Sequence, residues 1–108
     1  MQELLRFSER VNQEILERNK NSTPTELVFA RMVKVTEEVG ELASEVLASQ
    51  GDLRKEKLEK RDDESLGDEI ADVLITTLML AASLNVDVPG ALARKIAKIE
   101  KRFYGNIR

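Results

Sequence analysis

The sequence predicts an all-α fold, and three observations support this prediction. Hydrophobic residues recur at steps of three and four in four separate segments, which is the period of an amphipathic helix. The 108 residues include only five glycines and two prolines, so few positions interrupt a helix. Charged residues make up 34% of the chain and are of mixed sign, as is typical of helical surfaces. We expect one domain over residues 1–108, folded as a compact four-helix bundle.

The first two helices are predicted from their apolar stripes and from a start signal between them. A stripe of four residues predicts a helix over 2–19: Leu4, Phe7, Val11 and Ile15. Thr23 can then cap a second helix, Pro24 suits its first position, and Glu26 stands where a capping box places an acid. The apolar pattern continues to residue 49, so the second helix is predicted over 24–49.

The third and fourth helices differ in character. The stretch "IADVLITTLMLAASL" is apolar nearly all round, which predicts that the helix over 64–84 lies buried among its neighbours. Residues 51–63 before it are dense in charge and predict a solvated connection. Asp87 is a candidate cap for the last helix, over 88–104, which has an apolar stripe and a basic outer face.

Composition excludes several classes of function. The net charge of −3 gives no concentrated positive surface for a nucleic-acid polymer. The chain has no cysteine and no histidine, which removes thiolate and imidazole metal ligands and the usual general base. No stretch approaches 18 uninterrupted apolar residues, so neither a membrane span nor a signal peptide is predicted, and we expect a cytoplasmic location.

Carboxylates border the apolar stripes of two helices. At about 100° per residue, Glu38, Glu41 and Glu45 fall on one flank of the second helix, while Glu37 points nearly the opposite way. Two further acids, Glu69 and Asp72, are three residues apart and therefore share a face of the third helix. Asp72 stands inside the most apolar stretch, so we expect it to be buried.

Buried carboxylates that face one another either hold protons at neutral pH or need compensating positive charge, because an unpaired buried charge costs several kcal/mol. A divalent cation would supply that charge, and a ligand set made only of oxygens suits Mg²⁺, with Mn²⁺ as a substitute. The alternative is that the acids form ordinary solvated helix faces. Gly40, in the middle of the second helix, marks either the close approach of another backbone or a tolerated surface glycine.

Two of these segments resemble a known pair of motifs. The sequence "EEVGE" at 37–41, followed by "EIAD" at 69–72, is similar to the EExxE and ExxD pair of the MazG-like all-α nucleoside triphosphate pyrophosphohydrolases. The resemblance extends from about residue 27 to residue 103. It implies hydrolysis of a nucleoside triphosphate to the monophosphate and pyrophosphate with Mg²⁺, in the control or sanitising of a nucleotide pool.

The resemblance also assigns roles to particular residues. It implies four metal ligands, Glu38, Glu41, Glu69 and Asp72, and gives Glu38 and Glu41 a catalytic role without deciding which acid is the general base. It implies that Lys95 and Arg102 hold phosphates. Two further candidate substrate-binding residues are Lys34, one turn before Glu38, and Thr76, one turn beyond Asp72. Each of these four has an alternative role: Lys34 as a partner of Glu38, Thr76 as a donor to its own backbone, and the other two as part of a solvated basic face.

Two other functions remain as alternatives. A carboxylate-bridged redox metal bundle would place acids on facing helices, but the chain has no Glu-x-x-His sequence. A non-catalytic helical interaction module would use the acids as a partner-binding or metal-binding face. For any of the three functions, the apolar helix over 64–84 leads us to expect a homodimer or a tetramer of dimers.

Overall fold

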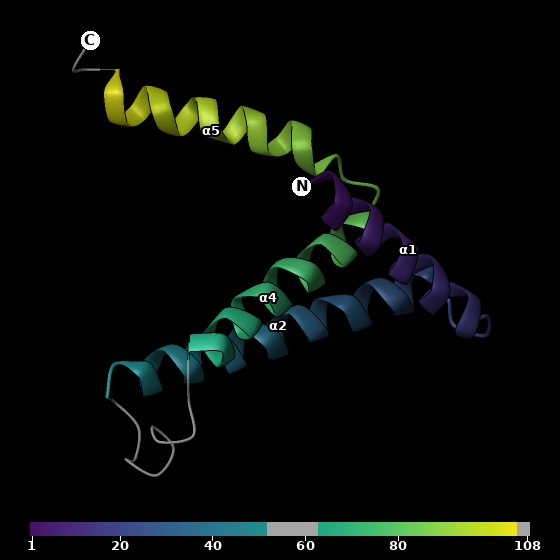
Figure 1. The fold of residues 1–108 in the computed structure, drawn as a ribbon. Coiled ribbons are helices and arrows are strands. Elements are labelled where there is room, and N and C mark those ends of the chain that lie inside the picture. Colours follow the sequence, from purple (N-terminus) through teal and green to yellow (C-terminus); the bar gives the residue numbers. More distant parts are fainter. Residues whose placement is uncertain (52–62, 106–108) are drawn as a thin grey trace.

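Four helices make up the described part of the chain in the computed structural model, which describes residues 1–51 and 63–105 (Figure 1). They are α1 (Gln2–Arg18), α2 (Pro24–Ser49), α4 (Asp63–Ser83) and α5 (Val88–Tyr104). The described residues contain no strand, and each helix begins and ends within one residue of its predicted bounds. The all-α prediction is therefore confirmed. Most of the connection predicted over 51–63 lies outside the described residues.

The start of α2 follows the predicted capping box. The Thr23 hydroxyl accepts a hydrogen bond from the Glu26 backbone N–H at 3.1 Å, and the Glu26 carboxylate accepts one from the Thr23 N–H at 3.3 Å. Pro24 occupies the first helical position, where its missing N–H leaves no bond unmade. These contacts fix the point at which the chain turns from α1 into α2.

A short corner joins α4 to α5. Asn85 takes a positive φ of 55°, and the Val86 N–H donates to the Ala81 carbonyl at 3.0 Å, which together close α4 in a left-handed cap. Asp87 then caps α5 by accepting a hydrogen bond from the Gly90 N–H at 3.2 Å. The chain bends by 115° here. No single described helix is long and apolar enough to cross a membrane; α4 and α5 meet that test only together, across this bend.

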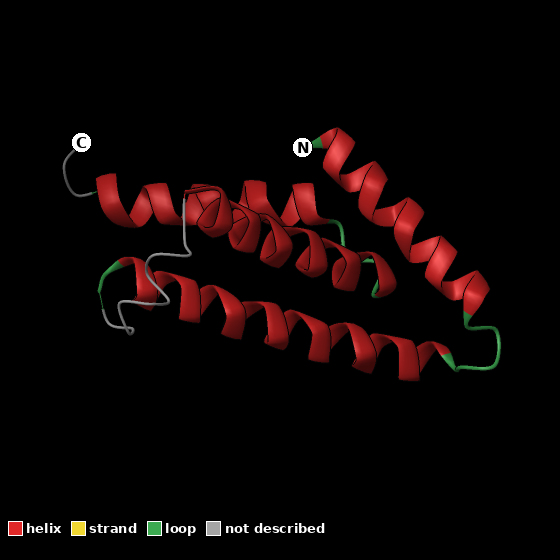
Figure 2. Ribbon diagram, turned by 60° about the horizontal axis from the view of Figure 1, so that its bottom comes forward, coloured by secondary structure: helices red, strands yellow, loops and turns green. Residues whose placement is uncertain are grey.

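Three of the four helices pack together. Figures 1 and 2 show α2 and α4 running antiparallel side by side, with α1 crossing α4 near its carboxyl end. Among the described residues the buried apolar core is small and consists of four residues: Leu27, Val35, Ala48 and Leu78. By contrast, α5 leads away from α2 and α4 (Figure 1) and has no buried residue in the described chain.

The fourth helix accounts for two differences from the sequence prediction. The expected compact packing of all four helices is absent from the single chain, whose radius of gyration of 17.6 Å exceeds the value of about 13 Å typical of a compact domain of this length. The expected burial of α4 on all sides is also wrong, because only Leu78 of its described side chains is fully buried. Since α5 turns away at the corner, it leaves one side of α4 uncovered.

A polar contact holds α1 against α2. Arg31 is buried, and its Nε donates to the Oδ1 of Asn12, also buried, at 2.8 Å. A second donor of Arg31, Nη2, bonds to the same oxygen. Because burial desolvates the guanidinium, the pKa of Arg31 is lowered from its ordinary value. The amide of Asn12 therefore orients a buried cation for which the described residues show no acidic partner.

We predict that Thr23→Ala lowers the free energy of unfolding by about 1 kcal/mol, because the Glu26 N–H loses its capping acceptor. Thr25→Ala is the matched control: Thr25 is exposed in the first turn of α2 and makes no capping bond. Urea unfolding followed by circular dichroism measures both variants. Equal loss in the two would contradict a capping role for Thr23.

Candidate metal centre

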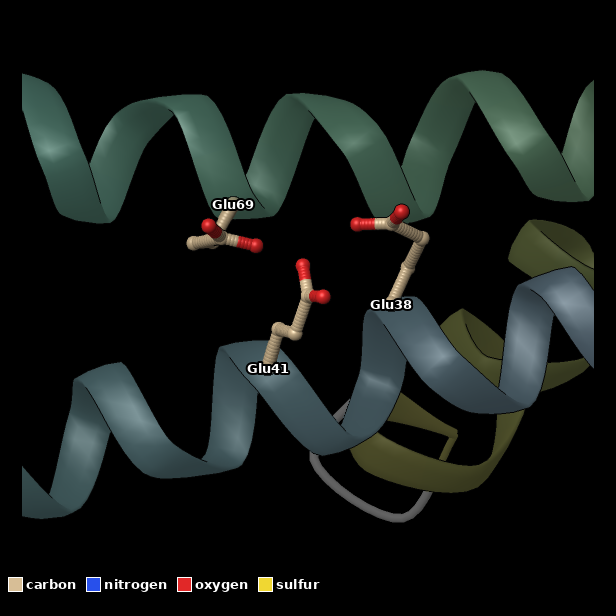
Figure 3. A group of neighbouring side chains, drawn as sticks. All are labelled: Glu38, Glu41 and Glu69. Atoms are coloured by element: carbon tan, nitrogen blue, oxygen red, sulfur yellow. The ribbon is translucent and has the colours of Figure 1, made fainter.

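Three glutamates converge in the space between α2 and α4. Glu38 and Glu41 project from α2, and Glu69 projects from α4 on the facing side (Figure 3). One carboxylate oxygen from each lies within 4.8 Å of the others. The two positions three apart on α2 reach the same space because residues at i and i+3 share a helix face. The packing of α2 on α4 therefore assembles a compact set of oxygen ligands.

Two of the three acids contain a buried oxygen that lacks a partner. The side chain of Glu38 is only 8% exposed, and its Oε1 lies 3.2 Å from Lys34 Nζ. The Oε2 atoms of Glu38 and Glu69 are buried without a hydrogen-bond partner among the described residues. Leaving such atoms unsatisfied is costly. Oxygen donors of this kind, close together and unpartnered, are suited to a hard divalent cation.

The electrostatics of the group follow from this crowding. The pKa of Glu69 is raised above its ordinary value, first by desolvation and then by the negative charges of Glu41, Asp72, Glu38 and Glu45. Lys34 contributes the cation paired with Glu38, and its pKa is raised chiefly by that hydrogen bond. One lysine does not neutralise three carboxylates, so the group favours the approach of a cation.

Asp72, the fourth predicted ligand, lies outside this group of three. It follows Glu69 by one turn, yet its side chain is exposed, so the expectation that it would be buried is wrong. Its charge nevertheless acts on Glu69, which places it in the electrostatic neighbourhood of the group. Its role as a ligand stays a prediction.

The two other acids in this part of α2, Glu45 and Glu37, have different surroundings. Glu45 is half-buried and accepts a hydrogen bond from the Ser65 hydroxyl at 3.4 Å, a contact across α2 and α4 that the sequence analysis missed. Glu37 is exposed and lies 3.5 Å from Lys34 Nζ, consistent with its predicted direction away from the other acids. A side chain at Gly40 would meet no described atom within 4 Å. Within the chain, Gly40 is therefore a surface glycine.

A pocket of about 350 Å³ is lined by two of the predicted substrate residues, Lys34 and Thr76. Lys34 lines it while also contacting Glu38, so this lysine connects the pocket to the carboxylates. Thr76 lines it too, and its hydroxyl donates to the Asp72 carbonyl at 2.8 Å. The backbone bond expected as one alternative for Thr76 is thus present. The lining is completed by Ile15, Ala30, Arg31 and Met79.

The other two predicted substrate residues lie elsewhere. Lys95 and Arg102 are exposed on α5, the helix that leads away from α2 and α4 (Figure 1). Within a single chain, the structure therefore does not bring them to the three glutamates. The 115° bend at the corner before α5 is the reason.

Arg31 is a candidate functional residue that the sequence analysis missed. It lines the pocket and is buried against Asn12. A signal for it was present, because Arg31 stands four residues after Leu27 and four before Val35, on the inward stripe of α2. A charged residue at an inward position indicates either a buried pair or a ligand site.

Comparison with known protein families matches residues 30–105 of the chain to the MazG-like family. The chain belongs to the MazG-like family. The matched region contains the acidic motifs at 37–41 and 69–72 and the whole of α5, but it begins inside α2. The helix α1, with Asn12 and part of the pocket lining, therefore lies outside the matched residues.

A curated relative is similar to part of the chain. The chain is 41% identical over 74 residues to the uncharacterized protein YpjD of Bacillus subtilis (strain 168). The match covers 68% of this chain and 65% of the relative, so the chain spans slightly less than two thirds of that protein's length. No solved structure matches the chain.

We predict that Mg²⁺ raises the melting temperature of the wild-type protein and that Glu69→Gln removes most of this shift. In the metal-free protein at neutral pH the same change is expected to raise the melting temperature, because it removes a desolvated charge that its neighbours repel. Differential scanning fluorimetry with EDTA or with millimolar Mg²⁺ measures both effects. Glu9→Gln, an exposed acid on α1, is the control.

The raised pKa of Glu69 also predicts how the stability of the metal-free protein changes with pH. A carboxyl with a raised folded pKa binds its proton more tightly in the native state, so its contribution to stability falls as the pH rises from the unfolded value through the folded value. The metal-free wild type is therefore expected to lose stability over that window relative to Glu69→Gln. Parallel pH profiles for the two proteins would contradict the raised pKa of Glu69.

Proposed function

We propose that this chain is a Mg²⁺-dependent nucleoside triphosphate pyrophosphohydrolase that converts a (deoxy)nucleoside triphosphate to the monophosphate and pyrophosphate. The observation that carries the proposal is the pair of unpartnered, buried carboxylate oxygens on Glu38 and Glu69, with Glu41 in the same group. Membership of the MazG-like family supports it. The metal suits triphosphate chemistry, since Mg²⁺ binds to a few carboxylates together with substrate phosphates.

Each acid has a distinct part in the proposed reaction. Glu38, Glu41 and Glu69 would hold the metal, and Asp72 is the proposed fourth ligand. Bound Mg²⁺ supplies charge neutralisation on the phosphates and a lowered pKa for the attacking water. Lys34 keeps one oxygen of Glu38 fixed by its ion pair at 3.2 Å.

Glu41 is the proposed general base. It is the exposed member of the group of three, so a water molecule reaches its carboxylate without breaking an ion pair, whereas Glu38 is buried and bound to Lys34. The water oxygen forms a bond to the α-phosphorus while the bond from that phosphorus to the bridging oxygen breaks. The water proton passes to Glu41, and pyrophosphate leaves with the bonding electron pair.

The pocket beside Lys34 is the proposed site for the nucleoside. Its walls combine the apolar side chains of Ile15 and Met79 with the polar groups of Arg31 and Thr76, a mixture typical of small-molecule sites. Lys34 stands between this pocket and Glu38. A nucleoside in the pocket would direct its phosphates past the lysine toward the carboxylates.

Identification of the products tests the reaction. We expect incubation with a panel of nucleoside and deoxynucleoside triphosphates in Mg²⁺ to yield monophosphate and pyrophosphate, resolved by anion-exchange chromatography. Glu41→Gln and Glu69→Gln are each expected to lower kcat/KM by about 100-fold or more, because metal and proton-transfer contributions amount to several kcal/mol. Asp72→Asn tests the fourth ligand, and Glu9→Gln is the control.

Several outcomes would contradict this function. Orthophosphate as the first product would exclude cleavage between the α and β phosphates. Folded protein that binds Mg²⁺ but turns over no nucleotide would favour the non-catalytic interaction module, for which the exposed apolar surface of α5 is the supporting observation. Activity that requires iron instead of Mg²⁺ would favour the redox alternative.

The role of Lys34 is tested separately. Lys34→Gln is expected to raise KM for the triphosphate by about 10-fold to 100-fold, since a charge-assisted hydrogen bond contributes roughly 1.5–3 kcal/mol. Lys20→Gln, a change in the exposed turn after α1, is the control. If KM is unchanged, Lys34 acts only as the partner of Glu38 and the phosphates follow another path.

A further inference from the structure

A buried cation lines the pocket proposed for the nucleoside. Arg31 is only 8% exposed, and it lines this pocket together with Ile15, Thr76 and Met79. The described residues that line the pocket include no acid. Burial of a charge is costly unless the charge is paired and hydrogen-bonded. The pocket therefore favours a ligand that accepts hydrogen bonds from Arg31.

Asn12 determines which donors of Arg31 remain available to a ligand. An arginine side chain has five N–H donors, and the Nε–H and one hydrogen of Nη2 both bond to the Oδ1 of Asn12. Asn12 is itself only 4% exposed, so this contact is shielded from water. The remaining donors, on Nη1 and Nη2, bond to no described residue. They form the end of the planar guanidinium, a geometry suited to two parallel hydrogen bonds.

The hydroxyl of Thr76 offers the pocket an acceptor. Its hydrogen is directed toward its own helix, where the oxygen lies 2.8 Å from the Asp72 carbonyl and 3.3 Å from the Val73 carbonyl. A hydroxyl oxygen also has two acceptor lone pairs, and Thr76 lines the pocket. The polar groups of the pocket wall therefore differ in kind, because Arg31 only donates, whereas Thr76 has its hydrogen engaged and accepts.

The position of Arg31 on α2 corresponds to the base end of a bound nucleotide. Arg31, Lys34 and Glu38 follow one another at steps of three and four, so they share a face of α2. At 1.5 Å per residue, Arg31 lies about 10 Å along the helix axis from Glu38. Lys34 lies between them and contacts Glu38 at 3.2 Å. A nucleotide whose phosphates lie at the glutamates would therefore have its base, and not its phosphates, beside Arg31.

The nucleic-acid bases differ at the edge that these groups would contact. Uracil, thymine, guanine and hypoxanthine have a carbonyl oxygen next to a ring N–H, whereas cytosine and adenine have an amino group next to an unprotonated ring nitrogen. The carbonyl oxygen accepts from Arg31, and the ring N–H donates to Thr76. An amino group would instead place a second donor against the guanidinium and leave both without an acceptor, which is costly in a buried site.

We propose that Arg31 and Thr76 select nucleotides whose base has an oxo group beside a ring N–H, in preference to the amino bases. The inference rests on the proposed function in one respect, which is that the pocket holds the nucleoside. Asn12 is a positioning residue, because it acts by orienting Arg31. It lies on α1, outside the residues that match the family, so the family match does not by itself carry this selectivity.

Nucleosides without phosphates test the pocket separately from the reaction. In EDTA the metal makes no contribution, so dissociation constants from NMR titration of 15N-labelled protein report on nucleoside binding alone. Deoxyuridine with deoxycytidine, and deoxyinosine with deoxyadenosine, are pairs of similar size that differ only at this edge of the base. The oxo member of each pair is expected to bind about 10-fold more tightly, because a bidentate contact to a base edge discriminates by a factor of this order.

Variants test the separate parts of the three residues. Arg31→Gln is expected to bring the two dissociation constants of each pair close together, because a glutamine amide both donates and accepts. Thr76→Val is expected to lower the preference by removing the acceptor at nearly constant shape. Asn12→Ala retains the charge of Arg31 but removes its orienting contact, so the preference should also fall. Arg6→Gln, at an exposed arginine on α1, is the control that keeps the preference.

The readout is chosen to separate recognition from folding. Circular dichroism checks that each variant keeps its helices. A ratio between two ligands of the same protein is insensitive to a general loss of stability, so a structural role alone would not change it. If Arg31→Gln does not fold, Thr76→Val and Asn12→Ala still decide whether the base edge is recognised.

Three results would overturn the inference. Equal binding within each pair, or tighter binding of the amino member, would show that this edge is not recognised. An oxo preference that survives in Arg31→Gln would assign it to other residues. Absence of nucleoside binding would exclude the pocket as the base site, and a parallel assay of triphosphate hydrolysis would show whether the proposed function stands without it. An oxo preference in a protein without hydrolase activity would support the inference and contradict the proposed function.

Discussion

The contact between α2 and α4 is the interaction on which the rest of the structure depends. It buries the small apolar core of the chain and at the same time brings Glu38 and Glu41 to face Glu69. Burial of apolar area at this contact stabilises the fold, whereas desolvation of carboxylates at the same interface destabilises it. A helix pair that retains unpartnered acids at its centre is less stable without a cation than an apolar pair of the same shape. The position of these acids is therefore better explained by ligand binding than by folding.

The surroundings of the group divide its members by role. Glu38 is buried and bound by Lys34, Glu41 is exposed, and Glu69 has a raised pKa from desolvation and neighbouring charge. These differences arise from which side of each helix is covered. On the covered side, toward α1, the buried Arg31 and Asn12 brace the wall of the adjoining pocket. The helix α1 lies outside the residues that match the family. We therefore expect this wall of the pocket to be a part of the molecule in which this chain differs from other family members.

The position of α5 depends on a few backbone bonds at its corner. Asn85 in the left-handed region and the cap at Asp87 set its direction, and this direction leaves an apolar stripe and a basic flank without a contact.

The sequence by itself determined the helices, their bounds and the carboxylates that matter. Periodicity, the capping box at Thr23 and the cap at Asp87 are local signals, so they are legible without a structure. Three of the four metal ligands predicted from the motif pair lie in one group. Only the tertiary structure decided that Asp72 is exposed, that Glu45 bonds to Ser65, and that Arg31 is buried on Asn12, since each depends on which helix covers which side. The direction of α5 could not be predicted from the sequence for the same reason. A four-residue corner sets this direction, and an apolar stripe does not indicate whether the helix that covers it belongs to the same chain.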